Sequence, residues 1–194
     1  CSRDWSSDVC SSDLTPFDTK QFTAVAPVAL GGNNWPPISF NQQTNLTYVC
    51  SGNMQNALKA VPIASLKFVG GQGFVGVEFD LGNAKGLTAF SGNFTAIDVR
   101  TNKIAWKKDY KQICSSGSFT TAGGLTFTGE ADGTYHAYNA ATGDELWSQK
   151  LEAGVNAPGG TYSINGKQYV VIYAGGGTFF GTNHGDAVYA FTVN

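Results

Sequence analysis

A segment that occurs twice, 41 residues apart, constrains the fold of this chain more than any other feature of its sequence. Residues 92–106 align without gaps on residues 133–147, and both copies have Gly, Ala, Thr and Trp at the same four positions. Each copy reads as an alternating run, a turn and a second run, and Gly143 in the second turn is free to adopt a positive φ. The repeat therefore predicts strand–turn–strand units.

Further strands are expected where alternating runs lie between turn residues. Asn165-Gly166 is the strongest hairpin signal, because both residues tolerate the positive φ of a two-residue turn. Strands are expected at residues 37–40, 46–50, 124–129, 134–139, 161–164, 167–173 and 187–192. No segment has a sustained helical period, and residues 53–76, the least readable stretch, are expected to form a long loop.

A repeat of about 40 residues with one tryptophan per copy is typical of β-propellers, in which each blade is a four-stranded antiparallel sheet. We therefore expect an all-β fold, a partial β-propeller of about three blades. Trp106 and Trp147 are interpreted as packing residues, because repeated aromatic residues usually pack between blades. The alternative is that one of these indoles stacks on a substrate.

Composition and charge exclude several kinds of site. The chain has 194 residues, a net charge of −2 and only 13% charged residues, so no broad basic surface is available to nucleic acid. No apolar run approaches the roughly 20 residues of a membrane-spanning helix. The two histidines are too few for a zinc site. Four aspartates are expected to cap turns rather than bind metal: Asp80, Asp98, Asp132 and Asp186.

The first residues differ in character from the rest. Residues 4–14, DWSSDVCSSDL, have no hydrophobic period and resemble one translated frame of a sequencing adapter. We therefore expect residues 1–14 to lie outside the fold and residues 15–194 to form the propeller part. On this hypothesis Cys1 and Cys10 have no structural role, and the natural protein extends further upstream. The alternative is a native disordered tail.

Residues 137–147, AYNAATGDELW, resemble the tryptophan-docking motif of dehydrogenases that depend on pyrroloquinoline quinone (PQQ), Ala-x-Asp-x-x-Thr-Gly-x-x-x-Trp. Residues 96–106 are similar, with Asn102 in place of the glycine. Other stretches resemble the alcohol dehydrogenase branch of this family: residues 31–37 (GGNNWPP), 114–124, 154–158 followed by 166–170, and the terminal 181–186. The resemblance covers about residues 17–194 and implies that the blades belong to an eight-bladed ring.

The same resemblance implies a cofactor site. In this family a flat PQQ lies near the axis of the ring, where Asn34 and Trp35 would approach the edge of the quinone. The loop with Asn156 and Ala157 would close over the cofactor. Amide groups suit this role because they hydrogen-bond quinone oxygens and carboxylates, and small residues permit close approach. Without the resemblance, residues 31–34 read as an ordinary turn.

The reaction that the resemblance implies is the oxidation of a small alcohol, polyol or sugar hydroxyl by PQQ in the periplasm. Calcium would polarise the quinone, an aspartate would act as general base, and electrons would pass to a cytochrome c or a membrane quinone. The family's calcium ligands and general base lie upstream of the matched stretch. We therefore expect no catalytic residue and no metal ligand in this C-terminal part, and no activity of the chain alone. The alternatives are a non-enzymatic PQQ-like propeller, which acts as a binding or assembly scaffold, and a carbohydrate-binding propeller.

Cys50 and Cys114 both lie in segments that carry the resemblance. A disulfide between them is one possibility, since the periplasm is oxidising. Two buried free thiols are the other, and the sequence leaves both open.

Overall fold

The computed structural model describes residues 17–27, 31–73, 75–80, 90–177 and 181–192. Within these ranges the chain is all-β apart from one 3₁₀ turn, η1 (Ile63–Ser65), as the sequence predicts. None of the described helical segments has the length and apolar character needed to cross a membrane. The chain divides into two compact units, residues 27–54 with 89–194 and residues 1–26 with 55–88. The expected boundary at residue 14 lies outside the described ranges, so it stays a prediction.

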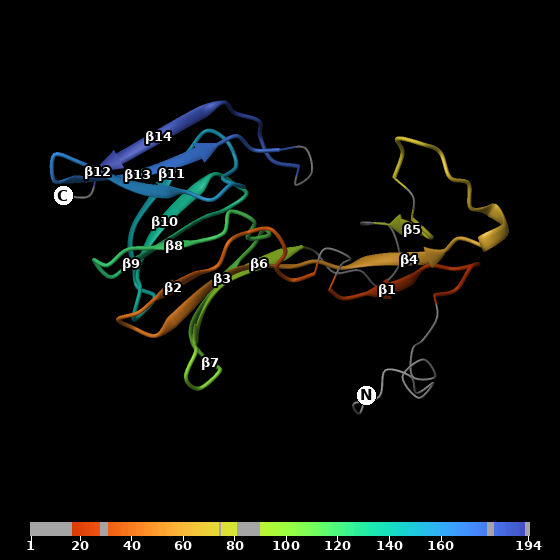
Figure 1. The fold of residues 1–194 in the computed structure, drawn as a ribbon, viewed down its shortest axis with the longest axis horizontal. Helices are drawn as coiled ribbons and strands as arrows, with labels where there is room; N and C mark the ends of the chain where they lie inside the picture. The colour runs from red at the N-terminus through yellow and green to blue at the C-terminus, as the bar shows by residue number, and fades with distance from the viewer. Residues whose placement is uncertain (1–16, 28–30, 74, 81–89, 178–180, 193–194) are drawn as a thin grey trace. The chain divides into compact units, whose positions relative to one another are not determined.

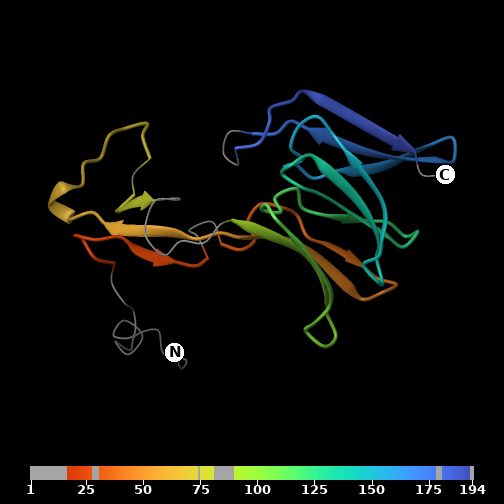
Figure 2. The same ribbon diagram turned by 180° about the vertical axis from the view of Figure 1, so that it is seen from behind.

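The larger unit consists of three antiparallel sheets that follow one another along the chain (Figures 1 and 2). The strand order is β2-β3-β6-β7 in the first sheet, β11-β10-β9-β8 in the second and β12-β13-β14 in the third. The strands are β2 (Ser39–Asn41), β3 (Leu46–Asn53), β6 (Ser91–Asp98), β7 (Lys103–Tyr110), β8 (Phe119–Thr120), β9 (Leu125–Gly129), β10 (Thr134–Asn139), β11 (Glu145–Lys150), β12 (Gly160–Ile164), β13 (Lys167–Ala174) and β14 (Ala187–Thr192). The strands expected in this unit are all present, and their ends differ from the expected ones by no more than three residues.

The two copies of the repeat have the same strand register. Ala96 pairs with Trp106 across β6 and β7, and Ala137 pairs with Trp147 across β10 and β11. In both pairs a bulge follows directly after the alanine. The bulge bends and twists each outer strand in the same way, so the two indoles begin from equivalent positions on their sheets.

The turns use the positive φ that their residues were expected to adopt. Asn102 and Gly143, at equivalent places in the two repeats, have φ of 56° and 75°. Asparagine tolerates this region better than most residues, which explains how it replaces glycine in the first copy. Asn165 and Gly166, with φ of 51° and 77°, form the two-residue turn of the β12–β13 hairpin.

Two hydrophobic clusters fill the spaces between consecutive sheets. The first junction, between the first and second sheets, contains Leu46, Tyr48, Cys50, Phe94, Ala96, Tyr110, Cys114, Tyr138 and Ala140, with Trp106 packed against them. The second junction, between the second and third sheets, contains Phe127, Tyr135, Ala137, Leu151, Ala153, Val155, Val170, Ile172 and Ala174. Sheets that pack face to face in chain order are the arrangement of consecutive propeller blades.

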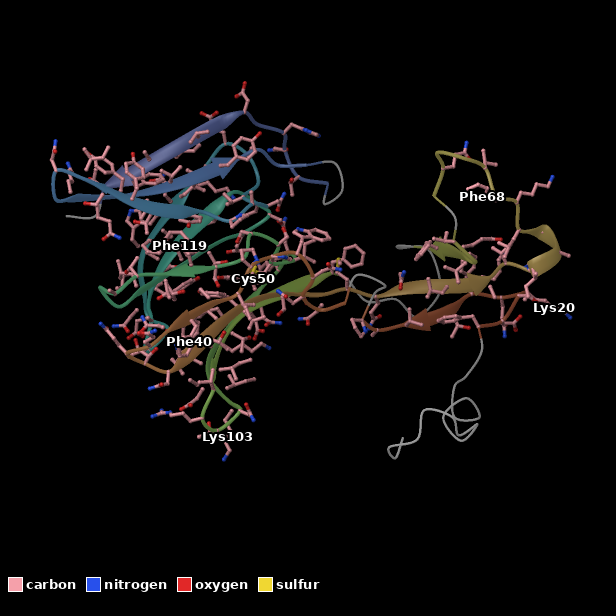
Figure 3. All side chains as sticks on the ribbon, in the orientation of Figure 1. Lys20, Phe40, Cys50, Phe68, Lys103 and Phe119 are labelled. Carbon is pink, nitrogen blue, oxygen red and sulfur yellow. A yellow bond between two sulfur atoms is a disulfide. The ribbon has the colours of Figure 1, made fainter. Side chains whose placement is uncertain are left out.

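The choice that the sequence left open for the two buried cysteines is decided by the structure. Cys50 on β3, labelled in Figure 3, forms a disulfide with Cys114, and their Cα atoms are 5.2 Å apart. The bond spans 64 residues of sequence. It therefore ties the segment that follows β7 to the middle of the first sheet.

The smaller unit contains a sheet of three described strands, β1 (Thr23–Val25), β4 (Asn56–Ala60) and β5 (Val77–Asp80), with β4 in the centre. The expectation of a long loop over residues 53–76 is therefore wrong for β4. Its sequence, Asn-Ala-Leu-Lys-Ala, lacks β-branched and aromatic residues, so its strand conformation depends on pairing with segments far away in the sequence. An ion pair of 2.7 Å between Lys59 Nζ and Glu78 Oε2 joins β4 to β5.

Candidate functional site

The loop that precedes β2 lines a small hollow. Asn34 and Trp35 line it together with Gly31, Gly32, Asn33, Pro36, Gly52, Met54, Ile113, Cys114 and Ser115. The loop is fixed to the second half of β3, because Asn33 Nδ2 donates to the carbonyl of Cys50 at 2.8 Å and the Gly52 N–H donates to the carbonyl of Gly32 at 2.7 Å. The Trp35 side chain is half exposed. Two of the expected site residues thus share one wall beside the disulfide.

Asn156 lies in the loop after β11, and its carboxamide has a partner on each side. Its Oδ1 accepts from Ser115 Oγ at 2.9 Å, and its Nδ2 donates to Thr182 Oγ1 at 3.1 Å. Thr182 directs its own hydroxyl proton to the carbonyl of Gly177, at 3.3 Å. Because that proton is committed, Thr182 can only accept from Asn156, and this fixes which end of the amide faces it.

Ser115 is the residue that connects the two predicted parts of the site. It lines the hollow with Asn34 and Trp35 and also holds Asn156. Asn156 and the half-buried Ala157 are not among the described residues that line the hollow, so the structure brings Asn156 to its wall only through Ser115. Sequence reasoning missed Ser115 and Thr182, although both lie in stretches that carry the family resemblance.

The residues around the hollow fit the edge of a flat polar quinone such as PQQ. They offer an indole surface, an amide, a hydroxyl and closely approaching backbone at Gly32 and Gly52. The hollow has a volume of about 30 Å³, which is room for one edge of such a ring system and not for all of it. No lysine or arginine is among the described residues that line it. This wall therefore suits hydrogen bonding and stacking, and charge compensation has to come from other groups.

Two of the four expected turn-capping aspartates have that role in the structure. Asp98 Oδ1 accepts from the Arg100 N–H at 2.8 Å, and Asp132 Oδ1 accepts from the Thr134 N–H at 2.8 Å. Hydrogen bonds from Arg100 lower the pKa of Asp98 to about 2. Asp80 is the last residue of strand β5, and the residues after it lie outside the described ranges, so its turn-capping role stays a prediction. Among the described residues no group of three or more acidic, histidine or cysteine side chains is arranged to hold a metal ion.

Trp106 has the packing role that the repeat predicts. Its Nε1–H donates to the carbonyl of Ala140, in the turn between β10 and β11, at 3.1 Å. A Cβ on Gly143 would lie 2.6 Å from the Trp106 ring, so the glycine is what allows the indole to come so close. The tryptophan of the first sheet thus packs against the β10–β11 turn of the second sheet.

Trp147 has different surroundings. It meets Phe191 of the third sheet edge to face, with ring centroids 5.0 Å apart, and 37% of the residue is exposed. A hollow of about 560 Å³ lies beside it, lined by Leu125, Phe127, Ala137, Leu146, Trp147, Val170, Ala190, Phe191 and Thr192. Trp147 therefore packs on the next sheet, as expected, but less tightly than Trp106.

Comparison with known proteins concerns the fold and the sequence of the chain as a whole. The model of the glucose/ethanol/alcohol dehydrogenase β-propeller domain, the PQQ family, matches residues 85–170. Over most of its length the chain is similar to quinoprotein and quinohemoprotein alcohol dehydrogenases. It is 36% identical over 165 residues to the quinohemoprotein alcohol dehydrogenase ADH-IIG of Pseudomonas putida, a match that covers 81% of this chain and 23% of that protein. It is 33% identical over 166 residues to the lanthanide-dependent methanol dehydrogenase of Methylacidiphilum fumariolicum, which covers 84% of this chain and 26% of that protein.

Solved structures of this PQQ family also superpose on the chain. The quinohemoprotein alcohol dehydrogenase of Comamonas testosteroni gives a TM-score of 0.76 at 29% identity, covering 90% of this chain and 28% of that one. The ADHIIG structure from Pseudomonas putida gives 0.71 at 31% identity, covering 80% and 24%. The three sheets are thus propeller blades, as predicted. The chain spans about a quarter of the length of these relatives.

Proposed function

We propose that this chain is the C-terminal part of a periplasmic PQQ-dependent alcohol dehydrogenase and contributes one wall of its cofactor site. The observation that carries the proposal is the hollow lined by Asn34 and Trp35, which Ser115 links to Asn156. When bound, PQQ supplies the two-electron oxidant for a small alcohol, polyol or sugar hydroxyl. The Asn34 amide would bind an oxygen of the cofactor, and the Trp35 indole would cover its edge and exclude water.

The catalytic base and the metal ligands are proposed to lie in other parts of the protein. The metal would be calcium, although one relative is described as lanthanide-dependent, so both ions belong in the test. A cytochrome c or a membrane quinone would accept the electrons, and several relatives are described as quinohemoproteins. The chain alone is then expected to have no dehydrogenase activity.

Reconstitution tests this proposal. The full-length protein that contains this chain is loaded with PQQ and either calcium or a lanthanide, and dye reduction is measured with a series of alcohols and polyols. We expect reduction by the loaded full-length protein and none by the chain alone. If quinone absorbance is lost on dialysis and no alcohol reduces the dye, the protein is a propeller of this fold with a scaffold role instead.

The contribution of the hollow is measured by PQQ titration of the full-length protein, with tryptophan fluorescence as the readout. Trp35→Ala and Asn34→Ala are each expected to weaken binding about tenfold, because a stacking surface or a hydrogen bond to a charged or polar oxygen is lost. Tyr162→Ala removes a similarly exposed ring on the third sheet and is the matched control. Equal affinities for PQQ in all three variants would show that Asn34 and Trp35 do not contribute to cofactor binding.

A further inference from the structure

A buried histidine with two carboxylates and two tyrosines lies at the first junction. His136, on β10, is only 6% exposed. Its Nδ1 lies 2.7 Å from Glu145 Oε2 on β11, and its Nε2 lies 2.9 Å from Glu130 Oε1 in the turn before β10. Both ring nitrogens therefore face a carboxylate oxygen.

This geometry favours two protons on the ring. A neutral imidazole has one N–H donor and one lone pair, so one of the two carboxylates would face a lone pair. The imidazolium donates to both. Burial alone would lower the pKa of His136, but the hydrogen bonds and charges of Glu130 and Glu145 outweigh it, and its pKa is raised above the ordinary value. Ser148 Oγ donates to the remaining oxygen of Glu145 at 3.0 Å, which holds that carboxylate in place.

Aromatic rings from both sheets contact the histidine. Tyr110 of the first sheet stacks on it with ring centroids 5.8 Å apart and planes inclined by 14°, and Tyr138 of the second sheet does so at 5.4 Å and 18°. The two tyrosine hydroxyls are 3.0 Å apart. Faces of aromatic rings attract a cation, so these two stacking contacts favour the protonated histidine. Lys108 Nζ, 5.9 Å from the Tyr138 ring, is the nearby cation from the first sheet.

The tyrosines do not titrate in the range that concerns the histidine. Burial raises the pKa of Tyr138 to about 12, and it raises the pKa of Tyr110 further. Both hydroxyls thus stay neutral, and the charge on His136 is set by the ring itself and by its two glutamates.

We propose that His136 is a proton-dependent lock between the first and second sheets. The protonated ring binds Glu130 and Glu145 within the second sheet and stacks under Tyr110 of the first. Loss of the proton leaves one carboxylate without its donor and removes the attraction between the cation and the Tyr110 ring. A group whose proton affinity is higher in the folded chain stabilises it fully at low pH and ceases to do so as the pH rises through its folded-state titration. The junction is thus tightest in mildly acidic solution.

Nitrogen-15 NMR of the imidazole rings tests the protonation state directly. The chain has two histidines, and a His184→Gln variant assigns the His136 signals without touching the junction. We expect both ring nitrogens of His136 to be protonated at pH 6. Glu145→Gln is expected to lower the proton affinity of His136 about tenfold, because a facing negative charge is removed. A neutral ring with a single tautomer at pH 6 would overturn the proposal.

Thermal unfolding between pH 5 and pH 9 tests the consequence for the junction. We expect the Tm of the wild-type chain and of His184→Gln to fall with rising pH in parallel, and that of His136→Gln to fall less steeply. If His136→Gln does not fold, Glu145→Gln, at a more exposed position, is expected to flatten the same slope. If the dependence of Tm on pH is unchanged in the variant that folds, the lock is contradicted. This outcome is independent of whether the chain contributes to PQQ binding.

Discussion

The two junctions begin from the same sequence pattern and end with different structures. Trp106 and Trp147 have the same register and the same neighbouring bulge. Trp106 donates to the carbonyl of Ala140 and lies against Gly143, whereas Trp147 has an edge contact with Phe191 and a large hollow beside it. The repeat therefore specifies the position of each tryptophan on its own sheet, and the turn of the following sheet specifies how tightly the indole packs. The described part of the third sheet ends at Thr192, before the place equivalent to that turn.

The largest expected effect comes from the disulfide, a feature that the described second junction lacks. Cys50→Ser with Cys114→Ser is expected to lower the free energy of unfolding by about 4 kcal/mol, because the bond restricts a long stretch of the unfolded chain. Urea unfolding with a constant m-value measures this loss. The wild-type chain under a reducing agent is the control and is expected to match the double variant. A loss below about 1 kcal/mol would mean that the junction holds its sheets without the bond.

The second largest expected effect is the difference in stability loss between substitutions of Trp106 and of Trp147. Trp106→Ala is expected to lower the free energy of unfolding by about 3 kcal/mol, and Trp147→Ala by about 1 kcal/mol, since Trp147 is more loosely packed. Trp106→Phe, which removes the N–H donor and part of the packed ring system, should cost about 2 kcal/mol. Urea unfolding of the three variants measures the contrast. Equal losses at the two alanine variants would show that both junctions pack alike in solution.

The smallest contrast concerns the two equivalent turn positions. Gly143→Ala is expected to cost about 2 kcal/mol, because the new Cβ meets both a positive φ and the Trp106 ring. Asn102→Ala should cost only about 1 kcal/mol, from the positive φ alone. In a Trp106→Ala background the two turn variants should become similar, as unfolding measurements on the double variants can check. If Gly143→Ala still lowers the free energy of unfolding by the same amount in that background, contact with the indole is not the cause of the loss.

Local signals in the sequence were sufficient for the strands and turns of the larger unit. Asn165-Gly166 determines its hairpin because its conformational preference is a property of two adjacent residues. Strand β4 was missed because its conformation comes from pairing with distant segments. The disulfide stayed open for the same reason, since it depends on how close β3 comes to the segment after β7.

The candidate site shows the same limit. Asn34 and Trp35 were found by family resemblance, and the structure places both at one hollow. Ser115 and Thr182 were missed because their role is to orient Asn156, a contact between residues 26 to 41 positions apart. The neighbours of His136 were missed as well: Glu130 and Glu145 approach it only once β9, β10 and β11 are paired in register. Such clusters are properties of the assembled sheets and leave no short motif.

In the contact between Trp106 and the Ala140 carbonyl, the first blade supplies the indole and the second blade supplies the turn that binds it. The effect of a natural substitution in that turn therefore depends on the sequence of the preceding blade. A substitution in the turn between β10 and β11 is expected to loosen the packing of Trp106, which belongs to the preceding blade, even when the sequence of that blade is unchanged. Tolerance at Gly143 thus depends on what stands at position 106, and the two sites are expected to vary together across evolution. A blade grafted into another ring would need a compatible turn downstream as well as its own tryptophan.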